Sequence, residues 1–181
     1  TAGLLYAVPT QGSTQAERFL VLSILGASRT LYITNSYFVP DDDQRRLLID
    51  AARRGVDVRI LTAGPPTDTK LTWFASHARY QELLEGGVRI FEYQPSMMHA
   101  KILTVDGLAA VIGSANLNQR SLMKDDEIAV LVLDPDFTEG LDRDFDDDRD
   151  HCRLITDARW ARRSWLGSLL QPLTRPFRHQ L

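Results

Sequence analysis

The sequence predicts an α/β fold in which helices are layered on a central mixed β-sheet. Two observations lead to this prediction. Between residues 14 and 93, segments with apolar residues at helical spacing alternate with short β-rich segments, at the interval typical of layered α/β domains. Further on, Asp106-Gly107 is a strong two-residue hairpin motif, which adds antiparallel strands to the sheet.

Helices are predicted wherever apolar residues recur every three or four positions. In the first helix, Phe19, Leu20 and Ile24 follow this spacing, and the second begins after Pro40 with carboxylates at its positive end. Gly55 ends the second helix, and Gly86-Gly87 ends the third. The predicted helices are residues 14–27, 41–54, 71–84, 137–149 and 158–170.

Strands are predicted for short runs rich in β-branched, aromatic and aliphatic residues. They are residues 4–8, 30–35, 56–61, 88–93, 99–105, 108–112 and 128–133. The run 108–112 is apolar throughout and follows the Asp106-Gly107 turn, so the chain is expected to fold back on residues 99–105.

Length and composition indicate one globular domain with a substantial core. The chain has 181 residues, of which 44% are hydrophobic and 25% charged. We predict one domain over residues 1–173 and a tail over 174–181. The net charge of −3 excludes a global positive field that would attract nucleic acid or anionic lipid, and the single cysteine, Cys152, excludes an internal disulfide. The longest apolar run near the start, residues 19–25, is far too short to span a membrane.

The candidate site lies around the predicted hairpin. Residues two apart on a strand point to the same side, so His99 and Lys101 are expected to share one face. If the hairpin pairs in register, the hydroxyl of Ser114 and the amide of Asn116 return beside them. A His-x-Lys pair alone is a weak pattern, because half-exposed strands often carry such residues on the solvent face.

The remaining histidines have ordinary structural interpretations. His77 is expected at a helix surface or the edge of the core, and His179 lies in the tail. His151 and Cys152 are too few ligands for a zinc site, so no metal is predicted. The aspartates of residues 142–150 are interpreted as a solvated helix face.

The motif His99-x-Lys101-x4-Asp106-x6-Gly113-Ser114-x-Asn116 resembles the HxKxxxxD signature of the phospholipase D superfamily. The segments 37–41, 54–59, 87–93 and 113–121 are similar to bacterial cardiolipin synthases, and the resemblance covers residues 30–173. It implies a phospholipase D-like domain. Such enzymes carry two copies of the signature, whereas this sequence holds one, whose flanks resemble the second copy. The resemblance therefore implies the C-terminal catalytic half of a two-half enzyme.

The resemblance also implies a reaction and site residues. The reaction is phosphatidyl transfer, or phospholipid phosphodiester hydrolysis, through a phosphohistidine intermediate and without cofactor or metal. His99 is assigned as general acid and base, with nucleophile as the weaker alternative. Lys101 is the phosphate clamp, and Asn116 and Ser114 donate hydrogen bonds to phosphoryl oxygens.

Two carboxylates complete the implied site. Glu127 matches the position that would accept a hydrogen bond from the second ring nitrogen of His99 and fix its tautomer. Asp106 belongs to the signature, yet its place at the hairpin tip makes a structural role at least as plausible as direct chemistry. The sequence has Asp125 where the family often has asparagine, so contacts to the head group are expected to differ there.

The partners implied are a phosphatidylglycerol-like phospholipid and a second half-site, either the N-terminal half of the same enzyme or a homodimer mate. The expected location is the cytoplasmic side of a bacterial inner membrane, contacted peripherally through the parent chain, with this segment itself soluble. A nucleic-acid phosphodiesterase is an alternative within the superfamily, and the acidic charge balance disfavours it. A second alternative is a half-site domain that is inactive without its partner.

Overall fold

A nine-stranded sheet forms the centre of the computed structural model, which describes residues 1–8, 13–68, 70–118, 121 and 125–156. The strands are β1 (Ala2–Val8), β2 (Ser13–Thr14), β3 (Thr30–Asn35), β4 (Asp57–Ala63), β5 (Arg89–Tyr93), β6 (Lys101–Val105), β7 (Ala109–Gly113), β8 (Glu127–Leu133) and β9 (Cys152–Ile155). Their order is β2-β1-β8-β7-β6-β3-β4-β5-β9. Strands β3, β4 and β5 are parallel and all other neighbours are antiparallel, so the prediction of a mixed sheet is confirmed.

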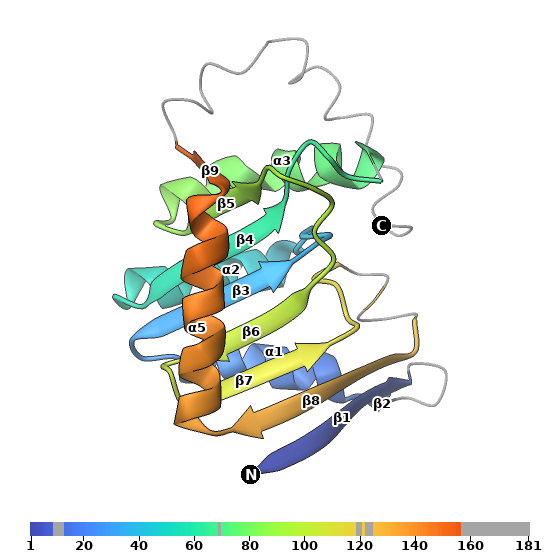
Figure 1. Cartoon of the computed structure of the whole chain (residues 1–181), viewed down its shortest axis with the longest axis vertical. Helices are drawn as coiled ribbons and strands as arrows, with labels where there is room; N and C mark the ends of the chain where they lie inside the picture. Colours follow the sequence, from blue (N-terminus) through green and yellow to red (C-terminus); the bar gives the residue numbers. More distant parts are fainter. Residues whose placement is uncertain (9–12, 69, 119–120, 122–124, 157–181) are drawn as a thin grey trace.

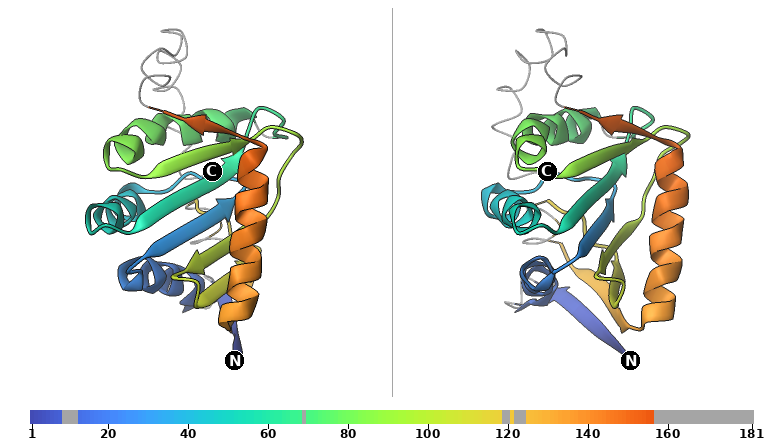
Figure 2. Two further views of the ribbon diagram at one scale, coloured as in Figure 1. Left: turned by 60° about the vertical axis from the view of Figure 1, so that its left-hand side comes forward. Right: turned by 90° about the vertical axis from the view of Figure 1, so that its left-hand side faces the viewer.

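Helices cover both faces of the sheet, as Figures 1 and 2 show. Helices α1 (Gln15–Gly26), α2 (Asp42–Arg53) and α3 (Lys70–Glu85) lie on one face, and α5 (Pro135–Asp150) crosses the other. Helices α2 and α3 each connect two neighbouring parallel strands, and crossovers of one hand place their helices on one face. The layered α/β prediction is therefore confirmed.

Two apolar clusters hold these layers together. The larger lies between the sheet and α1 to α3, and includes the fully buried side chains of Ile33, Ile60 and Leu83. The smaller lies under α5, where the ring of Phe145 stacks on Tyr32 with 5.0 Å between centroids. Burying one such aliphatic or aromatic side chain contributes about 1.5–3 kcal/mol, so the larger cluster dominates the stability.

Two local motifs form as the sequence predicts. The carboxylate of Asp41 caps α2 by accepting a hydrogen bond from the backbone N–H of Gln44 at 2.8 Å, and the Gln44 side chain accepts from the Asp41 backbone N–H at 3.2 Å. Asp106 and Gly107 have φ of 56° and 67°, the positive values that the tight hairpin turn requires. This turn pairs β6 with β7, so that Ile102 lies opposite Ile112.

The structure also corrects the prediction in three places. Strands β2 and β9 were not predicted, and His99 precedes β6 instead of lying within it. The predicted helix 158–170 and tail 174–181 lie outside the described residues. In the part of the chain that the structure describes, no helix has the length and apolar character needed to cross a membrane.

Candidate active site around His99 and Lys101

The candidate site lies at the edge of the sheet where the parallel strands end. Asn35 is the last residue of β3, and it pairs with Lys101, the first residue of β6. His99 lies two residues before Lys101. Sheets of α/β proteins place ligands at the carboxyl ends of their parallel strands, so the position of the cluster fits a binding site.

His99 and Lys101 contact each other directly. The Nζ atom of Lys101 lies 3.0 Å from Nδ1 of His99 and donates to the His99 carbonyl oxygen at 2.9 Å. An ammonium group is only a donor, so this contact makes Nδ1 the acceptor and puts the proton of the neutral ring on Nε2. The His99 side chain is exposed, so the ring has a proton to offer to a ligand.

Lys101 is held in place and shielded from solvent. Only 8% of the residue is exposed, and its Nζ also lies 3.5 Å from Oγ of Ser36. Burial lowers the pKa of Lys101, and the negative charges of Glu127 and Asp68 oppose that shift. The result is a positive charge fixed at the site, with carboxylates close enough to influence it.

Tyr37 and Asp68 extend the cluster and were not predicted as site residues. The Tyr37 ring meets the His99 ring edge-on, with 5.8 Å between centroids and 75° between planes. The Tyr37 hydroxyl donates to the Asp68 carboxylate at 2.8 Å. In the sequence, Tyr37 stands out only as part of the segment 37–41 that resembles the family, because no local pattern connects it with Asp68 or His99.

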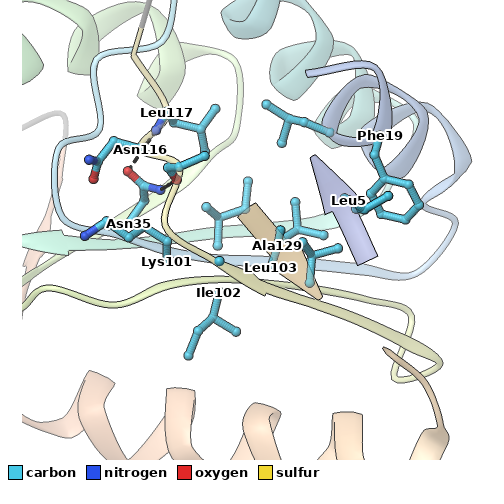
Figure 3. A pocket seen from close by; sticks show the side chains of 14 residues that line it. Leu5, Phe19, Asn35, Lys101, Ile102, Leu103, Asn116, Leu117 and Ala129 are labelled. Atoms are coloured by element: carbon cyan, nitrogen blue, oxygen red, sulfur yellow. Dashed lines mark hydrogen bonds between the residues drawn. The ribbon is translucent and has the colours of Figure 1, made fainter. Parts of the chain in front are cut away.

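Asn35 holds the loop that carries Asn116, as Figure 3 shows. Its Oδ1 accepts from the backbone N–H of Leu117 at 3.0 Å, and its Nδ2 donates to the carbonyl oxygen of Ala115 at 3.4 Å. The two bonds bracket Asn116. Asn35 is only 3% exposed, and no pattern in the sequence distinguishes it from the other residues of its strand.

Asn116 has an unused hydrogen-bonding atom at this site. Its Oδ1 is buried and has no hydrogen-bond partner among the described residues. Asn116 and Lys101 line the same end of one pocket (Figure 3). A buried amide oxygen without a partner costs free energy, which a group that donates a hydrogen bond to it can recover.

Glu127 and Ser114 bond to each other, which corrects the predicted contact between Glu127 and His99. The Ser114 hydroxyl donates to the Glu127 carboxylate and accepts from the backbone N–H of Ile128 at 3.1 Å. Within the described ranges no hydrogen bond joins Glu127 to His99. Ser114 is thus occupied with β8, while Glu127 still acts on Lys101 through its charge.

Asp106 lies at the opposite end of β6 from Lys101. Its carboxylate accepts from the backbone N–H groups of Ser28 at 3.0 Å, Arg29 at 2.7 Å and Thr30 at 2.9 Å, and from the Ser28 hydroxyl at 2.8 Å. Burial alone would raise the pKa of Asp106, but these hydrogen bonds outweigh it and lower the pKa. These contacts fix the segment between α1 and β3. They fit the alternative in which Asp106 has a structural role and takes no direct part in the chemistry.

The structure therefore brings His99, Lys101 and Asn116 together, places Ser114 and Glu127 beside them, and places Asp106 elsewhere. Across the described residues, no group of three or more His, Cys, Asp or Glu side chains is arranged to hold a metal ion. What the cluster offers is a proton donor, a fixed cation and an amide. This combination suits an anionic ligand whose leaving group needs a proton.

Sequence comparison links this arrangement to known proteins. A family described as cardiolipin synthase, PLD-like domain, matches residues 20–149. The cardiolipin synthase of Geobacillus kaustophilus is 34% identical over 167 residues, which cover 92% of this chain and 33% of the relative. Cardiolipin synthase A of Pseudomonas putida is 36% identical over 148 residues, or 82% of this chain and 31% of the relative. The chain thus spans about a third of the length of the curated relatives it matches.

Two solved structures share the fold. Nuc from Salmonella typhimurium, described as a phospholipase D family member, superposes with a TM-score of 0.74 at 22% identity, over 87% of this chain and 99% of Nuc. The phosphatidylserine synthase of Haemophilus influenzae superposes with a TM-score of 0.78 at 16% identity, over 97% of this chain and 45% of the synthase. The shared fold therefore makes up nearly all of Nuc and less than half of the phosphatidylserine synthase.

Proposed function

The chain belongs to the family of cardiolipin synthase, PLD-like domains, and we propose that it supplies one His/Lys/Asn set to an enzyme acting on phospholipid phosphodiesters. The reaction proposed is transfer of a phosphatidyl group to an alcohol, with hydrolysis as the side reaction. The single observation that carries the proposal is the joint placement of His99, Lys101 and Asn116 at one edge of the sheet.

Each of these side chains has a task that its geometry supports. Lys101 neutralises a phosphoryl oxygen from a fixed position, and Asn116 donates a hydrogen bond from its amide Nδ2 to the same group. His99 acts through Nε2, the ring nitrogen that Lys101 does not contact. Glu127 contributes indirectly, by its charge near Lys101 and by its bond to Ser114.

The proposed reaction has two steps and needs a second histidine. In the first step a ring nitrogen of that histidine attacks phosphorus, the P–O bond to the leaving alcohol breaks, and His99, as the imidazolium ion, gives its Nε2 proton to the departing oxygen and becomes neutral. In the second step an acceptor hydroxyl attacks phosphorus, His99 takes the hydroxyl proton, and the P–N bond breaks. One imidazole cannot be nucleophile and proton donor at once, so two sets are required.

The second set is proposed to come from the rest of a longer protein. The chain spans about a third of its cardiolipin synthase relatives, which leaves room for another domain in those proteins. A second copy of this chain is the other source, because a symmetric dimer would also bring two sets together.

The test is to incubate the chain with labelled phosphatidylglycerol, alone and with the part of a related cardiolipin synthase that it does not match. We expect cardiolipin or phosphatidic acid only in the mixture. Product from the chain alone would favour the symmetric dimer. Parallel reactions use single-stranded DNA to test the alternative that the substrate is a nucleic acid. Cleavage of DNA without phospholipid turnover would contradict the proposal.

A further inference from the structure

An apolar pocket runs from the candidate site into the space between α1 and the sheet, as Figure 3 shows. Lys101, Asn35 and Asn116 lie at one end, and Phe19 and Leu5 at the other. The pocket has a volume of about 70 Å³. That is room for two to three groups of the size of a water molecule or methylene.

Small residues on β7 and β8 create this space. Gly113 and Ala129 face each other on the side of the sheet that α1 covers, and a Cβ added to Gly113 would lie only 2.6 Å from the Ala129 Cβ. The strands therefore approach closely and carry almost no side-chain volume here. The larger side chains of Leu20 and Val111 line the pocket without filling it.

The two ends of the pocket differ in chemistry. One end presents the ammonium group of Lys101 and the amide of Asn116, whose Nδ2 can donate a hydrogen bond. The other end presents only aliphatic and aromatic groups. A ligand that satisfies both ends is an amphiphile, with an anionic group at one end and an apolar chain at the other. A nucleic acid strand has polar sugars on both sides of each phosphate and would gain nothing from the apolar end.

We infer that this pocket binds the first methylene groups of an acyl chain, in a phospholipid whose phosphodiester lies at Lys101 and Asn116. The inference rests on the proposed function and extends it by giving the acyl chain its own binding residues. Each methylene buried here strengthens binding roughly fourfold, because burial of a CH₂ group contributes about 0.8 kcal/mol. Two to three methylenes should therefore favour an acylated ligand about 15–60-fold over its deacylated head group.

The test compares the dissociation constants of monomeric dihexanoyl phosphatidylglycerol and of glycerophosphoglycerol, its deacylated form, for the 181-residue chain. Leu5→Phe narrows the pocket, while Leu4→Phe makes the same change on the next residue, which points to the opposite face and is 56% exposed. We expect the wild type and Leu4→Phe to prefer the acylated ligand about 15–60-fold. Leu5→Phe should lose this preference and still bind glycerophosphoglycerol.

A second measurement does not depend on how Leu5→Phe folds. In the wild type, nuclear Overhauser contacts should join the acyl methylenes to the side chains of Leu5 and Phe19. Equal affinities for the two ligands, or a preference that Leu5→Phe retains, would overturn the inference and leave the phosphate site intact. A dinucleotide bound as tightly as the lipid would also overturn it. Absence of binding by either phosphodiester would overturn the proposed function as well.

Discussion

At the scale of single residues, the hydrogen bonds of Asp106 and Asn35 show two ways in which a buried polar side chain shapes a loop. Asp106 accepts from three consecutive backbone N–H groups, at Ser28, Arg29 and Thr30, and so fixes the entry to β3. Asn35 both accepts and donates, and so fixes the backbone on either side of Asn116. The first supports the fold, and the second supports the candidate site.

Asp106→Asn should lower the free energy of unfolding by about 1–3 kcal/mol at pH 7, because the neutral amide replaces a charged acceptor of several buried N–H groups. Asparagine also tolerates the positive φ of the turn, so the hairpin itself should survive. Urea unfolding measures the difference, with Asp147→Asn on the exposed face of α5 as the control.

The effect of Asp106 should depend on pH. The folded-state pKa of Asp106 is lowered, so its stabilisation is fully present above the unfolded-state pKa of about 3.9 and disappears as pH falls through the folded-state pKa. The wild type and Asp106→Asn should therefore converge in stability below about pH 4. A difference of the same size at pH 7 and pH 3 would contradict this explanation.

Asn35→Ala should reduce kcat/KM of the reconstituted phospholipid reaction by about 10–100-fold, because it frees the loop that places Asn116. The matched control is Thr62→Val, the residue paired with Asn35 at the end of β4, which is also buried and polar but does not contact the loop. The two variants are compared by the activity that each loses for a given loss of stability. If this ratio is the same for both, Asn35 acts only through the fold.

At the scale of elements, a buried carboxylate joins α3, β5 and β9. Glu92 on β5 is fully buried, and its Oε1 lies 2.7 Å from Nε2 of His77 on α3. Its Oε2 accepts from Arg153 on β9, and the Tyr80 hydroxyl lies 3.5 Å from Oε1. Burial would raise the pKa of Glu92, but the contacts with His77 and Arg153 outweigh it and lower the pKa. The carboxylate is thus charged, and it holds an edge strand and a helix on one side of the sheet.

Glu92→Gln should lower the free energy of unfolding by about 3 kcal/mol, because it leaves the buried His77 and the part-exposed Arg153 without their charged partner. The change in urea midpoint measures this effect. Glu85→Gln, which changes an exposed residue at the end of α3, should have almost no effect on the free energy of unfolding. A loss below 1 kcal/mol for Glu92→Gln would mean that these charges are dispensable.

Which elements could be predicted follows from how local their causes are. Helix α2 is predictable because carboxylates such as Asp41 precede it and Gly55 follows it, and strand β3 because its residues are β-rich. Strand β9 was missed because it has only four residues and is held by pairing with β5 and by the contact of Arg153 with Glu92. Such long-range contacts leave no periodic pattern in the sequence.

The candidate site shows the same division. The hairpin motif predicts that Ser114 and Asn116 return beside His99 and Lys101, and the pairing of Ile102 with Ile112 confirms that β7 folds back along β6. The positions of Asn35 and Tyr37 depend on the pairing of β3 with β6 and on the loop that holds Asp68. The sequence therefore indicated the residues that offer chemistry, but not the residues that position them.

At the scale of the whole molecule, the cluster of His99, Lys101 and Asn116 lies at the carboxyl ends of the parallel strands. His99 is exposed there, while Lys101 beside it is buried. The helices α1 to α3 and α5 lie on the two faces of the sheet (Figure 2). The proposed two-histidine reaction needs a second domain to reach His99, and the exposed side chain of His99 fits this need.

The most direct test of this account is the rate of phosphatidyl transfer by His99→Asn in the mixture with the unmatched part of a related cardiolipin synthase. General acid catalysis typically contributes 10²–10⁴-fold, so we predict a fall of at least about 100-fold. Unfolding should be unchanged, because His99 is exposed, and His151→Asn, an exposed histidine at the end of α5, should keep full activity. Transfer by His99→Asn at the wild-type rate would contradict the central role assigned to His99.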